Sequence, residues 1–307
     1  MSHLPASAIA HTQAVNARRQ GVALFFCALV CFACYDAFCK WMLQDLPAPL
    51  MNLTRYISVS TIAMLWLLQA GKLRIWRTPC KGRLLVRGLA LGIVATCFMA
   101  ALVTMPLAEA TAIYFTAPLM MVALSPALLG ETVGRTQWCA VLAGFAGMLL
   151  IVRPGGNLPL VGTVLMVISA VCYALFQLLT RQLAGKVSGA VMYGWTALVC
   201  LMLTGIPALL MLPQTLPPWP TLLLIFAGGA CSGVAQLLLL AAFRRVTAST
   251  LAPLNYFQLL LAVLISTFVF HRPPDVIALA GIGMIMLSGG YLALCSQPTS
   301  LSRKSHV

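Results

Sequence analysis

The sequence predicts an all-α integral membrane protein with ten transmembrane helices arranged as two inverted five-helix repeats. Hydrophobic residues make up 61% of the 307 residues and charged residues only 8%, too few to cover a soluble globular protein. The apolar residues gather in ten stretches of about 20, the length of a helix that crosses the hydrocarbon core. The second five stretches also resemble the first five, which indicates an internal duplication.

Prolines, glycines and charged residues separate the ten stretches, as is typical of connections between helices. Almost nothing joins the third and fourth stretches around Pro106, so we expect a tight helical hairpin there. The expected spans are 21–43, 49–70, 84–104, 107–129, 136–152, 160–180, 188–211, 221–242, 248–270 and 276–295.

Lys and Arg residues are distributed unequally between the two sets of connections. If the N-terminus is cytoplasmic, fifteen of the 19, Arg87 among them, lie on the cytoplasmic side, and only Arg153 and Arg272 lie outside. The positive-inside rule then places residues 1–20 and 296–307 in the cytoplasm. Topology therefore accounts for the net charge of +14, and no basic patch remains for nucleic acid. We interpret the first span as an anchor that is not cleaved.

The duplication appears as a constant offset between the two halves. A shift of 141 residues aligns the first and sixth spans without gaps, so that Phe32 meets Tyr173 and Asp36 meets Gln177, and a shift of 140 aligns the fourth and ninth spans. Because each unit has five spans, the two units enter the membrane in opposite senses. In such inverted repeats the substrate site usually lies near the midplane between the halves. The expected repeats are 21–153 and 160–295.

Charged side chains within the spans are candidates for that site, because each costs about 2.5–3.5 kcal/mol at the centre of a helix. Asp36 and Lys40 share a face of the first span and can pair, Arg55 lies in the second, and Glu109 begins the fourth. Asp36 and Arg55 are compatible with a lining for a polar or zwitterionic substrate, with a proton-coupled carboxylate, or with a network that tethers helices. For Lys40 and Glu109 we favour an interfacial position.

Uncharged polar residues beside prolines in the fourth and ninth spans extend this set. A proline within a span frees backbone groups that transporters can direct at a ligand, although ordinary hydrogen bonds between helices are the alternative. Tyr193, Trp195 and Gln236 are further candidates for the wall. The candidate substrate-binding residues are Asp36, Arg55, Thr111, Tyr114, Thr116, Gln177, Asn255, Tyr256 and Gln258.

Neither a metal site, a cofactor site nor a catalytic site is predicted. The cysteines number eleven, an odd count, and ten lie in or beside apolar spans, so we interpret them as small packing residues rather than disulfides or ligands. No zinc-protease motif, nucleophile elbow or phosphate loop occurs, and we expect that the protein is not an enzyme.

Pairs of glycines four residues apart predict close approaches between helices. They are Gly88 with Gly92, and Gly229 with Gly233. Four glycines in the last span indicate a second close contact, which is compatible with a homodimer interface. They are Gly281, Gly283, Gly289 and Gly290.

Several short motifs mark the ends of the spans. They are Tyr35-Asp36-Ala37-Phe38-Cys39-Lys40-Trp41, Arg55-Tyr56, Pro106-Leu107-Ala108-Glu109, Gly130-Glu131, Val152-Arg153-Pro154-Gly155, Thr180-Arg181, Ala248-Ser249 and Ala252-Pro253-Leu254-Asn255-Tyr256. Over about 20–295 the chain resembles the drug/metabolite transporter superfamily, in its EamA group of paired five-helix domains. The resemblance implies a central cavity lined by the first, third, fourth, sixth, eighth and ninth spans. One departure is His271, which stands where the family usually has a glutamate.

These observations lead to the hypothesis of a secondary transporter in the bacterial inner membrane, which moves a small polar metabolite by alternating access. The resemblance implies relatives that export amino acids, aromatic metabolites or opine-type metallophores, and export is the direction we favour. Other relatives import riboflavin or nucleotide-like metabolites, so import is the alternative. Coupling to a proton or another ion stays open. Alternatives of other classes are a membrane enzyme acting on lipid-linked substrates and a scaffold that transports nothing.

Overall fold

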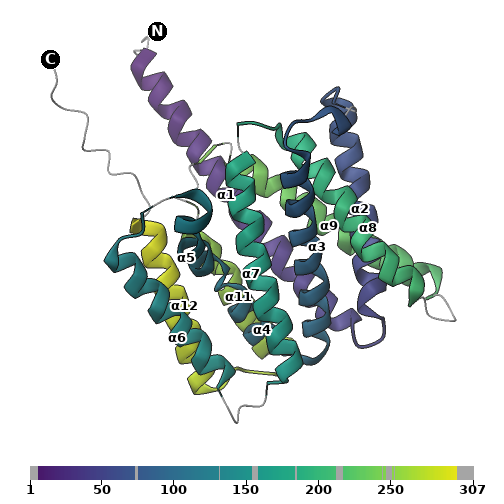
Figure 1. The fold of residues 1–307 in the computed structure, drawn as a ribbon, viewed down its shortest axis with the longest axis vertical. Helices are drawn as coiled ribbons and strands as arrows, with labels where there is room; N and C mark the ends of the chain where they lie inside the picture. Colours follow the sequence, from purple (N-terminus) through teal and green to yellow (C-terminus); the bar gives the residue numbers. More distant parts are fainter. Residues whose placement is uncertain are drawn as a thin grey trace, which may run out of the picture.

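The described part of the chain is a bundle of helices (Figure 1). A computed structural model describes residues 6–72, 75–130, 132–153, 158–183, 185–211, 217–243, 245–246, 251 and 253–295, and among these residues there is no strand. Several residues singled out in the sequence lie outside the described ranges: Glu131, Pro154, Gly155, Ala248, Ser249, Ala252 and the tail 296–307.

The two halves of the chain repeat one order of helices. The first half contains α1 (Ala6–Met42), α2 (Ala48–Gln69), the short 3-10 helix η1 (Ile75–Arg77), α3 (Lys81–Thr104), α4 (Leu107–Tyr114), α5 (Ala117–Leu129) and α6 (Arg135–Val152). The second half contains α7 (Leu160–Leu183), α8 (Gly189–Leu210), α9 (Trp219–Phe243), the 3-10 helix η2 (Pro253–Tyr256), α11 (Phe257–Phe268) and α12 (Val276–Cys295). Both ends of α8 follow those of α2 at the offset of 141 found in the sequence.

Length and composition make this a multi-pass membrane protein. Eight helical stretches among the described residues are long and apolar enough to cross a membrane. Helix α2 and the shorter apolar stretch Leu254–Phe268 complete ten segments. The predicted all-α membrane fold is confirmed. Helix α1 begins at Ala6, well before the expected start of its span. The part of α1 that is apolar enough to cross a membrane begins at Asn16.

The fourth and ninth spans differ from the expectation, because each is divided rather than continuous. Helix α4 ends at Tyr114, and α5 begins three residues later at Ala117. Pro118 explains this break: it has no N–H to donate to the carbonyl of Tyr114, four residues earlier. At the break, the Thr116 hydroxyl donates to the neighbouring carbonyl of Ile113 at 2.6 Å. In the second half, the 3-10 helix η2 begins at Pro253 and precedes α11.

Each half packs its third helix against the other half. Helix α3 contacts α7 and α8, and α9 contacts α1 and α2. A Cβ added to Gly88 would lie 2.7 Å from the Cβ of Val199, and one added to Gly229 would lie 2.7 Å from the Cα of Arg55. The glycine pairs therefore permit the close helix contacts that their spacing predicts. Gly229 in particular brings α9 against the backbone of Arg55.

Helices α6 and α12 pack together at one side of the bundle (Figure 1). A Cβ added to Gly281 would lie 2.4 Å from the carbonyl oxygen of Gly147. The space beside Gly289, where a side chain would lie, is occupied by the ring of Tyr256. Two of the four glycines expected at a homodimer interface are thus used within the chain. Nothing in the described residues lies within 4 Å of a Cβ at Gly283 or Gly290. The homodimer stays a prediction.

The largest buried apolar cluster lies at one end of the bundle, which we call the Pro106 end. It joins the last turns of α1 and α3 to the first turns of α2 and α4, through residues such as Met42, Met51, Met105 and Leu107. At the opposite end, which we call the Lys72 end, the buried residues form two separate clusters instead. Packing is therefore continuous at the Pro106 end and divided at the Lys72 end.

Candidate functional site

A cavity of about 150 Å³ lies within the bundle, between the two halves. Five of the nine candidate residues line it: Asp36, Arg55, Tyr114, Asn255 and Gln258. Gln236 and a set of apolar and aromatic residues from both halves complete the wall: Leu29, Phe32, Tyr56, Leu91, Val94, Ala95, Phe98, Phe115, Pro118, Tyr173 and Leu239. The divided spans supply Tyr114, Phe115 and Pro118 from one half and Asn255 and Gln258 from the other. This central cavity is the candidate substrate site.

The two charged residues of the cavity are held by different kinds of partner. The Gln258 amide Nε2 donates a hydrogen bond to Asp36 Oδ2 at 3.1 Å. The Arg55 guanidinium lies over the rings of Tyr35 and Tyr56, 4.8 and 5.7 Å from their centroids. Stacking of this kind attracts a cation through the negative face of the ring. Opposite charges from α1 and α2 therefore face one cavity.

The two charges of the cavity do not pair with each other, and Arg55 is not fully satisfied by the described residues. Asp36 and Arg55 form no ion pair there, and Arg55 Nε is buried without a hydrogen-bond partner. A buried polar group normally has a partner, because leaving it unpaired costs about 1–3 kcal/mol. The guanidinium can thus donate to an anionic group in the cavity, and the carboxylate can accept from a cationic one.

Aromatic rings form much of the remaining wall. Tyr114 packs edge-on against Phe98 at 5.4 Å between ring centroids, and it lies 4.9 Å from Tyr173. Such surfaces stack on planar groups of a ligand. These rings, apart from Tyr114, were absent from the candidate set. The repeat offers a signal for them, because Phe32 and Tyr173 occupy equivalent positions and both line the cavity.

Four candidate residues lie behind the wall rather than on it. Thr111 and Tyr256 are buried with hydroxyls that have no partner among the described residues. The Thr116 hydroxyl already donates a hydrogen bond to the carbonyl of Ile113. Gln177 Nε2 donates to the Tyr173 hydroxyl at 3.3 Å and so supports a wall residue without lining the cavity itself.

Lys40 does not pair with Asp36, as its spacing on α1 allowed. Its Nζ donates to the carbonyls of Leu102 and Met105 at 2.7 and 2.8 Å. The cause is Pro106, which has no N–H to donate to the Leu102 carbonyl at the end of α3. A cation also interacts favourably with the negative end of a helix. Lys40 is thus a cap for α3.

Arg87, which the charge count assigned to the cytoplasmic side, is buried. It is not in a connection but inside the bundle, 7% exposed, on the second turn of α3. Its Nε donates to Thr180 at 2.7 Å, and its Nη1 donates to the Met192 carbonyl at 3.1 Å and to the Thr196 hydroxyl. The guanidinium also lies 4.3 Å from the centroid of Phe176. Arg87 therefore ties α3 of the first half to α7 and α8 of the second.

A smaller cavity of about 60 Å³ lies between Arg55 and Arg87. It shares Arg55, Tyr56, Leu91 and Gln236 with the central cavity. Tyr193 lines it, and Gln236 lines both cavities, so these two wall candidates are near the site. Trp195 lines neither cavity and donates from its indole Nε1 to the carbonyl of Ile75.

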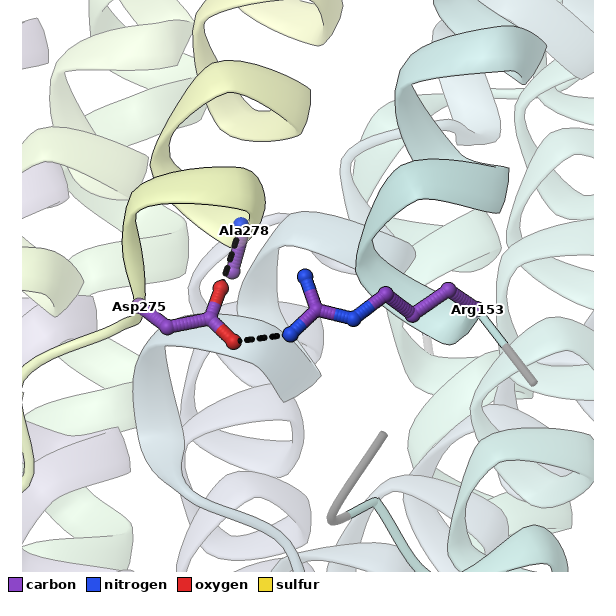
Figure 2. A network of polar contacts seen from close by, with 3 residues as sticks. All are labelled: Arg153, Asp275 and Ala278. Carbon is purple, nitrogen blue, oxygen red and sulfur yellow. Dashed lines mark hydrogen bonds and ion pairs between the residues drawn. The ribbon is translucent and has the colours of Figure 1, made fainter. Parts of the chain in front are cut away.

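A polar contact between the halves lies at the Pro106 end (Figure 2). Arg153 Nη2 donates to Asp275 Oδ2 at 2.6 Å, and the backbone N–H of Ala278 donates to Asp275 Oδ1 at 2.7 Å. The second bond lies in the first turn of α12, where backbone N–H groups lack helical partners. That N–H and the guanidinium lower the pKa of Asp275 below its usual value. This pair links the end of α6 to the start of α12.

Among the described residues, no group of three or more His, Cys, Asp or Glu side chains could hold a metal ion. The ten cysteines whose side chains the structure describes are free.

Comparison with protein families gives a match over most of the chain. The model of the EamA-like transporter family matches twice, at residues 19–153 and 160–292. The two matches fall on the two helix repeats.

Individual relatives are transporters with different named cargoes. The chain is 25% identical to an S-adenosylmethionine uptake transporter of Rickettsia bellii, over 92% of this chain and 96% of the relative. It is 26% identical to a riboflavin transporter of Rhizobium johnstonii, over 80% and 81%. It is 27% identical to a pseudopaline exporter of Pseudomonas aeruginosa, over 88% and 94%. A crystal structure with 20% identity has a TM-score of 0.63 and covers 90% of this chain and 96% of its own, which supports the fold.

Proposed function

The chain belongs to the EamA-like transporter family, and we propose that it is a secondary transporter that moves a small polar metabolite across the bacterial inner membrane by alternating access. Transport as such agrees with the named relatives, which are transporters rather than enzymes. The observation that carries the proposal is a cavity between two repeats, lined by Asp36 and by Arg55, whose buried Nε has no hydrogen-bond partner among the described residues.

The substrate class follows from the chemistry of the wall. We assign Arg55 to an anionic group of the substrate, Asp36 to a cationic group, and the rings of Phe98, Tyr114 and Tyr173 to a planar part. A carboxylate or phosphate suits the planar donors of a guanidinium, and an ammonium suits a carboxylate. The proposed substrate is therefore a zwitterionic metabolite that carries a planar ring, with Asn255 and Gln258 selecting its polar substituents.

The side to which the cavity opens follows from the packing and from the charge distribution. The continuous apolar cluster closes the Pro106 end, whereas the cavity wall extends from Phe98 toward Leu29 and Leu239. Most Lys and Arg residues belong to connections at the Lys72 end, which the positive-inside rule assigns to the cytoplasm together with both termini. We propose that the structure is the cytoplasm-facing state.

Export is the direction we propose, and uptake is the second candidate. A cytoplasm-facing resting state gives cytoplasmic substrate direct access to the cavity, and one relative is named as an exporter. Uptake is favoured by a different observation: two relatives that match over 92% of the chain are named as uptake transporters. Both directions use the same cavity.

The test is a metabolite comparison between cells that lack the gene, cells that carry it and cells that overexpress it. Metabolites are measured inside the cells and in the medium. Export predicts one compound that accumulates inside the deletion strain and is depleted from its medium. Uptake predicts a nutrient that the deletion strain leaves in the medium. Identical profiles in all strains across rich and minimal media would contradict transport.

A further inference from the structure

A second, open cavity of about 730 Å³ lies at the Lys72 end and shares no residue with the central cavity. One wall is the connection between α2 and α3, with Lys72, Arg77 and Thr78. The other wall is the connection between α7 and α8, with Lys186 and Ser188. The two connections belong to different halves of the chain, so the cavity lies across the junction of the repeats.

The electrostatics of this cavity favour an anion. Its lining contains three cationic side chains, Lys72, Arg77 and Lys186, and no acidic residue. The chain has only 5 Asp and Glu against 19 Lys and Arg. The ion pair found among the described residues, Arg153 with Asp275, lies at the opposite end of the bundle. The three cations therefore lack a carboxylate partner in the described part of the chain.

Uncharged donors complete the cavity. Ser188 is the N-cap of α8, yet its side chain makes no capping bond, and its hydroxyl oxygen is buried without a partner. The first N–H groups of a helix have no partner within the helix, and the helix dipole adds positive potential there. A hydroxyl, the N-terminus of a helix and three cations form a set that suits the oxygens of a phosphate group.

Two tryptophans beside the cavity, Trp76 and Trp195, indicate its depth relative to a membrane. Trp76 adjoins Arg77 and is 58% exposed, and its ring packs edge-on against Trp195 at 5.1 Å between centroids. The Trp195 Nε1 donates to the Ile75 carbonyl at 3.1 Å, and this bond joins α8 to the short helix η1 beside the cavity. Exposed tryptophans concentrate at the level of the lipid head groups. The cavity is therefore at the depth where phospholipid phosphates lie.

We propose that this cavity binds a phosphate group, and that its source is the head group of an anionic phospholipid. Basic cavities between helices at the membrane boundary are suited to such head groups. A bound phosphate would contact Lys72 and Arg77 from one half and Lys186 and Ser188 from the other. It would thus hold the two repeats together at the Lys72 end. Free inorganic phosphate carries the same chemistry and is the other source.

The experiment uses the purified full chain in dodecyl maltoside, with thermal unfolding followed as phosphatidylglycerol, phosphatidylcholine or inorganic phosphate is added. The test variant is Lys72→Gln with Arg77→Gln and Lys186→Gln. The matched control is Lys81→Gln with Arg83→Gln and Arg135→Gln, which removes the same charge from exposed residues outside the cavity at the same end. Ser188→Ala is a second, uncharged probe.

Phosphatidylglycerol should raise the Tm of the wild type and the control variant by roughly 5 °C at 100 times its Kd, and phosphatidylcholine should not. The rise should disappear in the test variant and shrink in Ser188→Ala. The same pattern with inorganic phosphate alone would support the phosphate site and assign it to a soluble ligand. Equal responses of the test and control variants, or no response to either phosphate source, would overturn the proposal.

Discussion

Asp36 and Gln258, 222 positions apart in the chain, form a hydrogen bond of 3.1 Å across the central cavity. The carboxylate belongs to α1 of the first half, and the amide belongs to α11 of the second. Each residue follows a feature of its own half: Asp36 lies one turn before the Lys40 cap, and Gln258 follows the 3-10 helix η2. The bond therefore reports how the two halves are placed around the cavity.

A double-mutant cycle should detect this bond. Gln258→Leu leaves the Asp36 carboxylate with one donor fewer, so we expect a loss of about 1.5–3 kcal/mol, the range for a hydrogen bond to a charged group. Once Asp36→Asn is present, Gln258→Leu should cost much less, because an amide is cheaper to leave unpaired. Unfolding in detergent measures all four proteins. A coupling energy near zero would show that the bond does not stabilise the fold.

Arg87 should stabilise the bundle without contributing to surface charge. Arg87→Gln removes three hydrogen bonds that join α3 to α7 and α8, and we expect a loss of about 2–4 kcal/mol in unfolding free energy. Arg83→Gln, one turn earlier on α3 and exposed, should be close to neutral. Thermal unfolding of the two variants checks this difference. Equal stability of both would mean that Arg87 does not join the halves.

Gly229 should be intolerant of even one added methyl group. A Cβ there would lie 2.7 Å from the Cα of Arg55, and backbone cannot move aside as a flexible side chain can. Gly229→Ala should therefore separate α9 from α2, at a cost of about 1–3 kcal/mol, and shift Arg55 within the cavity.

The control for that substitution is Gly283→Ala in α12, where no described atom lies within 4 Å of the new Cβ. Thermal stability and substrate binding are measured for both variants. We expect Gly283→Ala to match the wild type or to exceed it slightly, because alanine favours helix. A Gly229→Ala protein with unchanged binding and stability would contradict the close contact.

The Arg153–Asp275 pair should make the stability of the fold depend on pH in the acidic range. The pKa of Asp275 is lower in the folded chain than in the unfolded chain, so its ionised form is favoured by folding. This stabilisation is present above the unfolded pKa of about 3.9 and is lost as pH falls through the lower folded pKa. Tm measured against pH for the wild type and Asp275→Asn should therefore differ at neutral pH and converge in acid. Parallel curves down to acid pH would contradict the assignment.

Sequence patterns were sufficient for the fold because the membrane imposes simple lengths. Ten apolar stretches, the offset of 141 and the glycine pairs anticipated the helices, their order and their close contacts. The break at Phe115 was not anticipated, although its cause, Pro118, was visible. A span was read as one continuous helix, whereas the proline acts on a single backbone hydrogen bond.

The site was only partly predictable, because membership of a span does not give the direction of a side chain. Asp36, Arg55 and Gln258 line the cavity, but Thr116 and Tyr256, which belong to the divided spans, do not line it. Arg87 was counted with the connections because it lies near the start of α3, and charge counting cannot distinguish an exposed arginine from a buried one. The carbonyls that accept from Lys40 belong to residues 62 and 65 positions away. One of them lacks a backbone donor only because Pro106 has no N–H.

The most direct test of the central claim is flux through the purified chain in proteoliposomes, using the metabolite that the cellular comparison identifies. We predict saturable transport by the wild type and by Asp45→Asn, whose carboxylate is exposed in the turn after α1. Asp36→Asn and Arg55→Gln, at normal thermal stability, should lower kcat/KM by roughly tenfold or more, since each removes a charge that meets the substrate. Wild-type flux in both of these variants would contradict the assignment of the central cavity as the transport site.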